Sequence, residues 1–155
     1  MRSVARLRYC GGLVDKQHLQ KLAKMRLKDA QSLLGRRRWS GAYYLSGYVV
    51  ECALKACLLK HLGESGSIFG SPGYLRQLAD CWTHDLVKLV NLAGLDADFG
   101  AARSANPVLG GYWGITKDWK ETSRYDEKTE TDVRELFEAV SHKPDGVFLW
   151  IQSRW

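Results

Sequence analysis

The chain has 155 residues, of which 45% are hydrophobic and 26% are charged. These values are enough for one folded domain with a hydrophobic core, and they exclude wholesale disorder. The net charge is +6, but three of these charges come from Arg2, Arg6 and Arg8, before the first acidic residue, Asp15. The rest of the chain is therefore only mildly basic.

No apolar stretch approaches the roughly 20 residues that a membrane-spanning helix needs. In the first 14 residues no apolar run is longer than a pair such as Leu13-Val14, which is too short for a secretory signal. Cys52 and Cys57 lie five residues apart on an expected helix, an unsuitable geometry for a disulfide. We therefore expect a cytoplasmic protein without membrane association. Residues 1–14 are expected to form a flexible arm and residues 15–155 a single helical domain.

The first helix is predicted over residues 15–35, with Asp15 as its N-cap and Gly35 as its stop. Its apolar residues recur at the three-and-four spacing of an amphipathic helix. Three arginines, Arg36-Arg37-Arg38, follow it. They either form a solvated helix end, where cations favour the C-terminal dipole, or contact phosphate groups.

Residues 39–62 predict a second, central helix that ends at Gly63. Apolar side chains cover nearly its whole circumference, which is typical of a helix with neighbours on several sides. Gly47 is expected to let another backbone come close.

One face of this helix carries Tyr44, Tyr48, Glu51 and Lys55, at positions i, i+4, i+7 and i+11. Charged side chains in an apolar helix must be paired or line a cavity. Glu51 and Lys55 have the spacing and the orientation of a favourable ion pair.

The middle of the chain has weaker signals. Residues 63–73 are rich in glycine and serine and predict a loop, and residues 74–81 predict a short helix. Thr83 is expected to cap the helix that follows. Residues 94–125 are the least regular part and carry several aromatic side chains. They predict a segment that wraps over the core, with one short helix around residues 116–121.

Helical periodicity returns after Thr129, and Thr129 or Thr131 is the expected cap of a helix that Pro144 ends. Residues 147–151 are apolar and fit a strand or a helix. Because no partner strand is predicted elsewhere, a strand would leave its backbone groups unpaired, and we expect a terminal helix. The predicted fold class is all-α, an up-and-down bundle of four to five helices.

Three stretches, in this order, resemble the HEPN family, named for higher eukaryotes and prokaryotes nucleotide-binding. The first is Arg26-Leu27-Lys28-Asp29-Ala30 with Leu33-Leu34, and the second and most specific runs over residues 42–56. The third comprises His84-Asp85-Leu86, then Trp119 with Ser123-Arg124-Tyr125, and finally Gly146-Val147 with Trp150-Ile151. The resemblance covers about residues 20–151.

The resemblance implies an up-and-down helical bundle that commonly forms a homodimer. Relatives act as RNA-cleaving toxins, as partners of small nucleotidyltransferases, or as binding modules without catalysis. In the nuclease branch an Arg is followed four to six residues later by a His, which transfers protons while the Arg stabilises phosphate charge. Here the closest pairs, Arg76 with His84 and Arg134 with His142, have seven residues between them.

We therefore expect a HEPN-like binding module that engages a nucleotide, RNA or a nucleotidyltransferase partner, as in a toxin–antitoxin pair, without catalysis of its own. One alternative is an atypical, metal-independent ribonuclease in which His84 or His142 transfers protons. A second alternative is a purely structural helical dimer.

The candidate ligand-binding cleft comprises Tyr44, Tyr48, Glu51, Lys55, His84, Arg124 and Tyr125. Arg124 is expected to pair with Glu51. Arginine suits phosphate recognition, tyrosines can stack on a base, and His84 and Arg124 are the candidates for any catalysis. Alternatively these residues form a structural ion-pair network, in which His84 caps its helix or bonds to a buried carboxylate.

A zinc site is a further alternative, because Cys57 with His61 and Cys81 with His84 are spaced to supply four ligands. Nothing in the sequence brings these two pairs together. We therefore predict neither a metal nor a cofactor.

Overall fold

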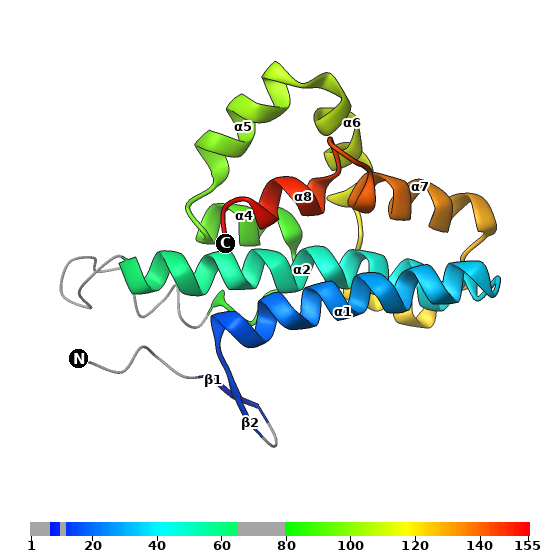
Figure 1. The fold of residues 1–155 in the computed structure, drawn as a ribbon, viewed down its shortest axis with the longest axis horizontal. Coiled ribbons are helices and arrows are strands. Elements are labelled where there is room, and N and C mark those ends of the chain that lie inside the picture. The colour runs from blue at the N-terminus through cyan, green and yellow to red at the C-terminus, as the bar shows by residue number, and fades with distance from the viewer. Residues whose placement is uncertain (1–6, 10–11, 65–79) are drawn as a thin grey trace.

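A computed structural model describes residues 7–9, 12–64 and 80–155 (Figure 1). The described chain begins with a β-hairpin in which β1, Leu7–Tyr9, pairs antiparallel with β2, Gly12–Val14. The sequence predicts no strand in this segment. The two strands have three residues each, and such short strands leave no alternating pattern to detect.

The helix α1 spans Lys16–Gly35 and α2 spans Trp39–Glu64. The side chain of Asp15 accepts a hydrogen bond from the backbone N–H of His18 at 2.8 Å, so the predicted N-cap is confirmed. The predicted stop at Gly35 is also confirmed. Between the two helices, Arg37 has a φ of 55° and reverses the chain. As a result, α1 and α2 lie antiparallel along most of their length (Figure 1).

The helix α2 is the centre of the molecule. It contacts α1, α4 (Leu86–Leu92), α7 (Glu130–Ser141) and α8 (Val147–Gln152). Its fully buried apolar residues lie on several sides of the helix: Ala42, Val49, Val50, Ala53, Leu54, Ala56 and Leu58. The prediction of a central helix with neighbours all round is therefore confirmed.

Gly47 allows a close approach, but of a side chain and not of a backbone as predicted. The indole ring of Trp119 occupies the space that a Cβ at position 47 would need. Trp119 is almost completely buried and also packs against Tyr44, with ring centroids 5.9 Å apart.

The cap of α4 is Asp85 and not Thr83. The carboxylate of Asp85 accepts a hydrogen bond from the backbone N–H of Lys88 at 3.0 Å, while the Thr83 hydroxyl accepts one from the Asp85 N–H at 3.2 Å. Thr83 therefore orients Asp85, which caps α4. Gly63 lies inside α2, and most of the predicted loop at 63–73 and helix at 74–81 falls outside the described residues.

The prediction of an irregular wrap over residues 94–125 is wrong. This segment forms α5 (Asp96–Ala105), α6 (Pro107–Thr116) and a 3-10 helix, η1 (Glu121–Tyr125). The expected short helix at residues 116–121 is absent, because α6 ends at Thr116 and η1 begins at Glu121.

The physical reason lies in capping and packing, which outweigh the low helix propensity of glycine. Asn106 accepts hydrogen bonds from the backbone N–H groups of Val108 and Leu109, and Pro107 occupies the first turn of α6, a position that proline favours. Leu109 and Trp113 then bury one face of α6.

The C-terminal helices agree with the sequence. Thr129, and not Thr131, is the N-cap of α7, and it forms a capping box with Asp132. The apolar segment after Gly146 is the helix α8, as expected. The described part of the chain thus holds seven α-helices, more than the four or five predicted. In the same residues no helix is both long and apolar enough to cross a membrane.

Candidate functional site

A groove of about 510 Å³ lies between α1, α2, η1 and the segment that precedes α4. Its walls include Tyr44, Tyr48, Glu51, Lys55, His84 and Arg124, all of them predicted cleft residues. The remaining predicted residue, Tyr125, is not part of the wall, and 79% of its surface is exposed. The periodicity of α2 brings the first four residues together, whereas tertiary packing brings His84 and Arg124 to them.

Glu51 is the most deeply buried charged residue of the groove, with 2% of its surface exposed. Its Oε1 atom accepts a hydrogen bond from Lys55 Nζ at 2.8 Å and lies 2.9 Å from His84 Nδ1. Its Oε2 atom is buried and receives no hydrogen bond from the described residues. Glu51 is therefore paired as a buried charge must be, and within the described part of the chain this pairing uses one of its two oxygens.

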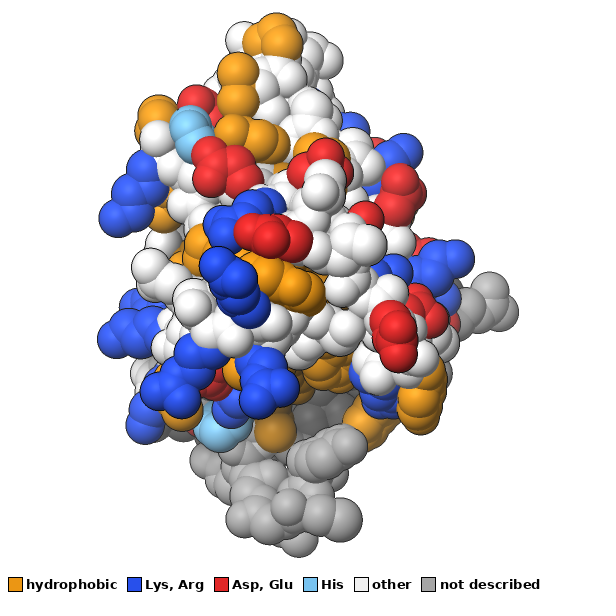
Figure 2. Space-filling model, turned by 90° about the vertical axis from the view of Figure 1, so that its right-hand side faces the viewer, with side chains coloured by type: hydrophobic (Ala, Val, Ile, Leu, Met, Phe, Trp, Pro, Cys, Tyr) orange, Lys and Arg blue, Asp and Glu red, His pale blue; other side chains and the backbone are white. Residues whose placement is uncertain are grey.

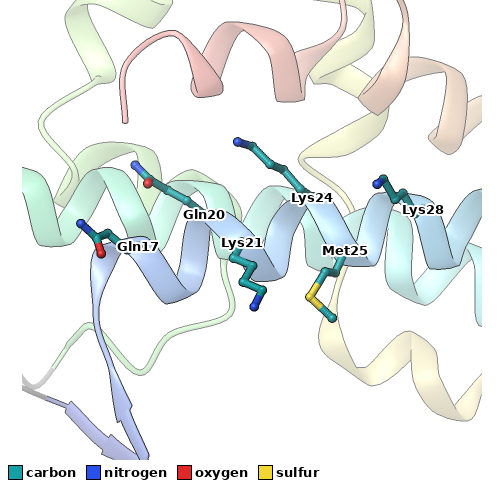
Figure 3. A pocket seen from close by; sticks show the side chains of 6 residues that line it. All are labelled: Gln17, Gln20, Lys21, Lys24, Met25 and Lys28. Atoms are coloured by element: carbon teal, nitrogen blue, oxygen red, sulfur yellow. The ribbon is translucent and has the colours of Figure 1, made fainter.

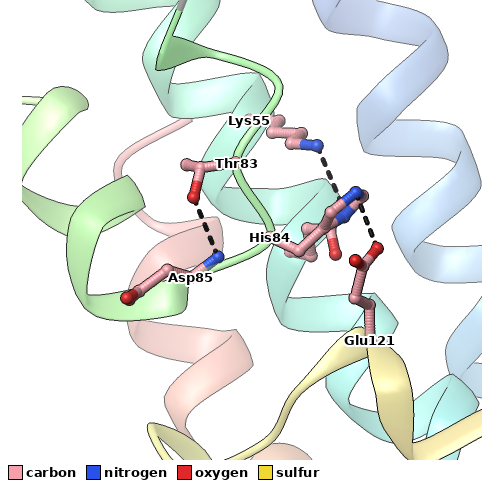
Figure 4. A network of polar contacts seen from close by, with 6 residues as sticks. Lys55, Thr83, His84, Asp85 and Glu121 are labelled. Carbon is pink, nitrogen blue, oxygen red and sulfur yellow. Dashed lines mark hydrogen bonds and ion pairs between the residues drawn. The ribbon is translucent and has the colours of Figure 1, made fainter.

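His84 lies between two carboxylates (Figure 4). Its Nδ1 faces Glu51, and its Nε2 lies 2.7 Å from Oε2 of Glu121. Both contacts are hydrogen bonds only when both ring nitrogens carry protons. The ring thus joins three elements: α2, η1 and the segment before α4.

The predicted ion pair between Arg124 and Glu51 is wrong. Arg124 is exposed and its guanidinium lies over the ring of Tyr125, 5.0 Å from the centroid. A hydrogen bond with Tyr125 is the largest factor that raises the pKa of Arg124. Arg124 still lines the groove, while the carboxylate of Glu51 pairs with Lys55 and His84.

Two tyrosines supply the aromatic part of the groove. The rings of Tyr44 and Tyr48 are stacked, with centroids 6.0 Å apart and planes inclined by 9°. Burial is the main cause that raises the pKa of Tyr48 above its ordinary value. The phenol therefore stays protonated at neutral pH and can donate a hydrogen bond.

Cys52 and Cys57 are free and buried thiols, and Cys81 is also buried. Burial raises the pKa of Cys52 to about 12 and that of Cys57 to about 11. The alternative of a zinc site gains no support, because no group of three or more His, Cys, Asp or Glu residues suitable for a metal ion occurs within the described ranges.

Several groove residues escaped the sequence analysis. They are His18, Leu19 and Leu22 on α1, together with Trp82 and Glu121 outside the α-helices. The signal for Glu121 was weak because its element is a five-residue 3-10 helix, which has no amphipathic period to read.

Of the two Arg–His pairs considered for RNA cleavage, the pair Arg134 with His142 does not line this groove. Arg134 forms an ion pair with Glu130 at 2.7 Å, and His142 lies beside Tyr112, with ring centroids 5.3 Å apart. Arg76 lies outside the described residues. Comparisons of the chain with protein-family models, with curated proteins and with solved structures give no match.

Proposed function

We propose that this protein is a HEPN-like binding module whose groove binds a nucleotide. The proposal is supported by one arrangement above all: a buried carboxylate, with one oxygen that no described residue hydrogen-bonds, shares a groove with Lys55, Arg124 and two stacked tyrosine rings. The groove volume of about 510 Å³ falls in the range typical of small-molecule sites, roughly 300–1,000 Å³.

Each part of a nucleotide has a matching group in the groove. The rings of Tyr44 and Tyr48 offer a surface for a base. Arg124 and Lys55 are suited to phosphate oxygens. The Oε2 atom of Glu51, which lacks a hydrogen bond from any described residue, accepts an N–H or O–H of the ligand.

The test measures binding of AMP, CMP, GMP and UMP by isothermal titration calorimetry. Arg124→Gln removes an exposed phosphate ligand without disturbing the core, and we expect the Kd to rise about 10- to 100-fold, since a charged hydrogen bond contributes roughly 1.5–3 kcal/mol. Arg134→Gln, an exposed arginine on α7, is the matched control and leaves the Kd unchanged. No binding of any of the four nucleotides, or equal losses in both variants, contradicts the proposal and favours a purely structural ion-pair network.

The proposal includes two partners that the resemblance implies: a second copy of the chain and a small nucleotidyltransferase. Light scattering on purified protein tests the homodimer, which doubles the mass of 17.5 kDa. Co-purification with a nucleotidyltransferase encoded by the neighbouring gene tests the paired toxin–antitoxin arrangement. A monomer at all concentrations argues against the homodimer. Elution of the two proteins in separate fractions argues against the nucleotidyltransferase partner.

A second candidate function, metal-independent RNA cleavage, is favoured by the geometry of His84. A buried carboxylate holds its Nδ1 at 2.9 Å, which orients an imidazole in the way that proton-transferring histidines are oriented. The test incubates a structured RNA with the protein in the presence of EDTA. Cleavage that His84→Ala abolishes and His142→Ala leaves intact favours this function, and intact RNA excludes it.

A further inference from the structure

The exposed side of α1 carries a basic surface outside the groove. Gln17, Gln20, Lys21, Lys24, Met25 and Lys28 line a shallow depression along the helix. Lys21 and Lys24 point to opposite sides of the helix axis (Figure 3). We call these six residues the α1 basic face.

The charges of this face are not neutralised. Lys21 and Lys28 are exposed and have no ion pair among the described residues, and Lys24 lies over the ring of Trp155 at 5.5 Å. Asp29 is the only acidic residue of α1, and Arg26 pairs with it at 2.8 Å. The α1 basic face therefore presents free positive charge to solvent.

Basic residues continue beyond the helix. Arg36, Arg37 and Arg38 follow the C-terminus of α1, and all three are exposed. With a rise of 1.5 Å per residue, Lys21 and Arg36 are about 22 Å apart along the axis. Figure 2, which views the end of the molecule where α1 meets α2, shows lysine and arginine side chains gathered on its left-hand side.

The α1 basic face and the groove meet on the first turns of α1. Gln17, Gln20 and Lys21 belong to the face, whereas His18, Leu19 and Leu22 line the groove. One extended ligand can therefore contact the α1 basic face and the groove at the same time.

We infer that the α1 basic face binds the sugar-phosphate backbone of a single-stranded RNA, one base of which enters the groove. A polyanion matches an extended row of unpaired cations, and a base can enter a groove only if it is unpaired and unstacked. The proposed position of the RNA rests on the proposed function of the groove as a nucleotide-binding site. A membrane surface fits less well, because Met25 is the only large apolar side chain on the face, and interfacial helices need an apolar side.

The test measures binding of a fluorescent 20-nucleotide oligouridine over a range of salt concentrations. The variant Lys21→Gln/Lys28→Gln removes two phosphate contacts, so the slope of log K against log salt falls in magnitude by about 1.4 and the affinity at 0.1 M salt falls about 25-fold. The control Lys117→Gln/Lys143→Gln changes the net charge equally at two other exposed lysines. Its slope is expected to match that of the wild type.

The outcomes separate this inference from the proposed groove. Equal losses in the two double variants, or no loss in either, overturn the inference, because the binding would then depend on net charge or on another surface. The inference is also overturned, in favour of a lipid surface, if Lys21→Gln/Lys28→Gln loses binding to phosphatidylserine vesicles while its RNA binding is unchanged. If Arg124→Gln weakens nucleotide binding while Lys21→Gln/Lys28→Gln leaves RNA binding intact, the groove stands and the α1 basic face does not.

Discussion

The indole of Trp119 lies directly on the backbone of Gly47, in the space that any larger side chain at position 47 would fill. Through this contact, the segment between α6 and η1 packs against the middle of α2. It thereby sets the position of η1, which carries Glu121 and Arg124 to the groove.

Gly47→Ala is expected to destabilise the protein by about 1–3 kcal/mol, because the added methyl group forces a buried ring to move. Gly111→Ala is the matched control, since a Cβ at this helical glycine meets no atom within 4 Å. Its expected effect is a stabilisation of about 0.5–1 kcal/mol. Urea denaturation of both variants measures the difference. Equal stability of the two variants contradicts the packing described.

Lys55→Met tests the pairing of Glu51. The substitution leaves a carboxylate that is 2% exposed with His84 as its remaining partner, and we expect a loss of about 1–3 kcal/mol in the free energy of unfolding. Lys60→Met, in the same helix, removes only a hydrogen bond to the neutral carbonyl of Arg154 at 3.0 Å. Its expected loss is below about 1 kcal/mol. The reverse order of the two losses argues against a buried charge at Glu51.

The capping box of α7 predicts a pH dependence. Hydrogen bonds from the backbone and side chain of Thr129 lower the pKa of Asp132 below its ordinary value of 3.8. Because the folded pKa is depressed, the stabilisation is complete above pH 3.8 and is lost as the pH falls through the folded value. Asp132→Ala is therefore expected to lower the Tm at neutral pH, with a difference that shrinks below pH 3.8.

The control for this prediction is Glu135→Ala, an exposed carboxylate in the same helix. It removes the same charge without a cap and leaves the Tm nearly unchanged across the pH range. Thermal unfolding followed by circular dichroism measures both variants. A constant Tm difference between wild type and Asp132→Ala from pH 7 to pH 2 contradicts the prediction.

The buried thiols predict slow alkylation of the native protein. Burial raises the pKa of Cys52 to about 12 and that of Cys57 to about 11, and only the thiolate reacts. We expect iodoacetamide at pH 8 to leave both residues unmodified in the native protein and to modify both in urea, as mass spectrometry of peptides shows. Rapid labelling of Cys52 without denaturant contradicts its burial beside Glu51.

Local patterns were sufficient for the parts of the fold that depend on neighbours in the chain. The apolar circumference of α2 predicted a central helix, and Asp15 and Thr129 predicted two caps, because the backbone groups at a helix start need local acceptors. The same reasoning failed over residues 94–125. There, glycines masked the helix α6, which Asn106 caps and which burial of Trp113 stabilises.

The candidate site divides in the same way. The sequence by itself determined that Tyr44, Tyr48, Glu51 and Lys55 share a face, because 3.6 residues per turn decides which side chains of one helix are neighbours. Only the tertiary structure decided that His84, and not Arg124, pairs with Glu51, and that Glu121 closes the other side of the imidazole. These contacts join residues far apart in the chain, and their choice depends on how Trp119 and the segment before α4 pack against α2.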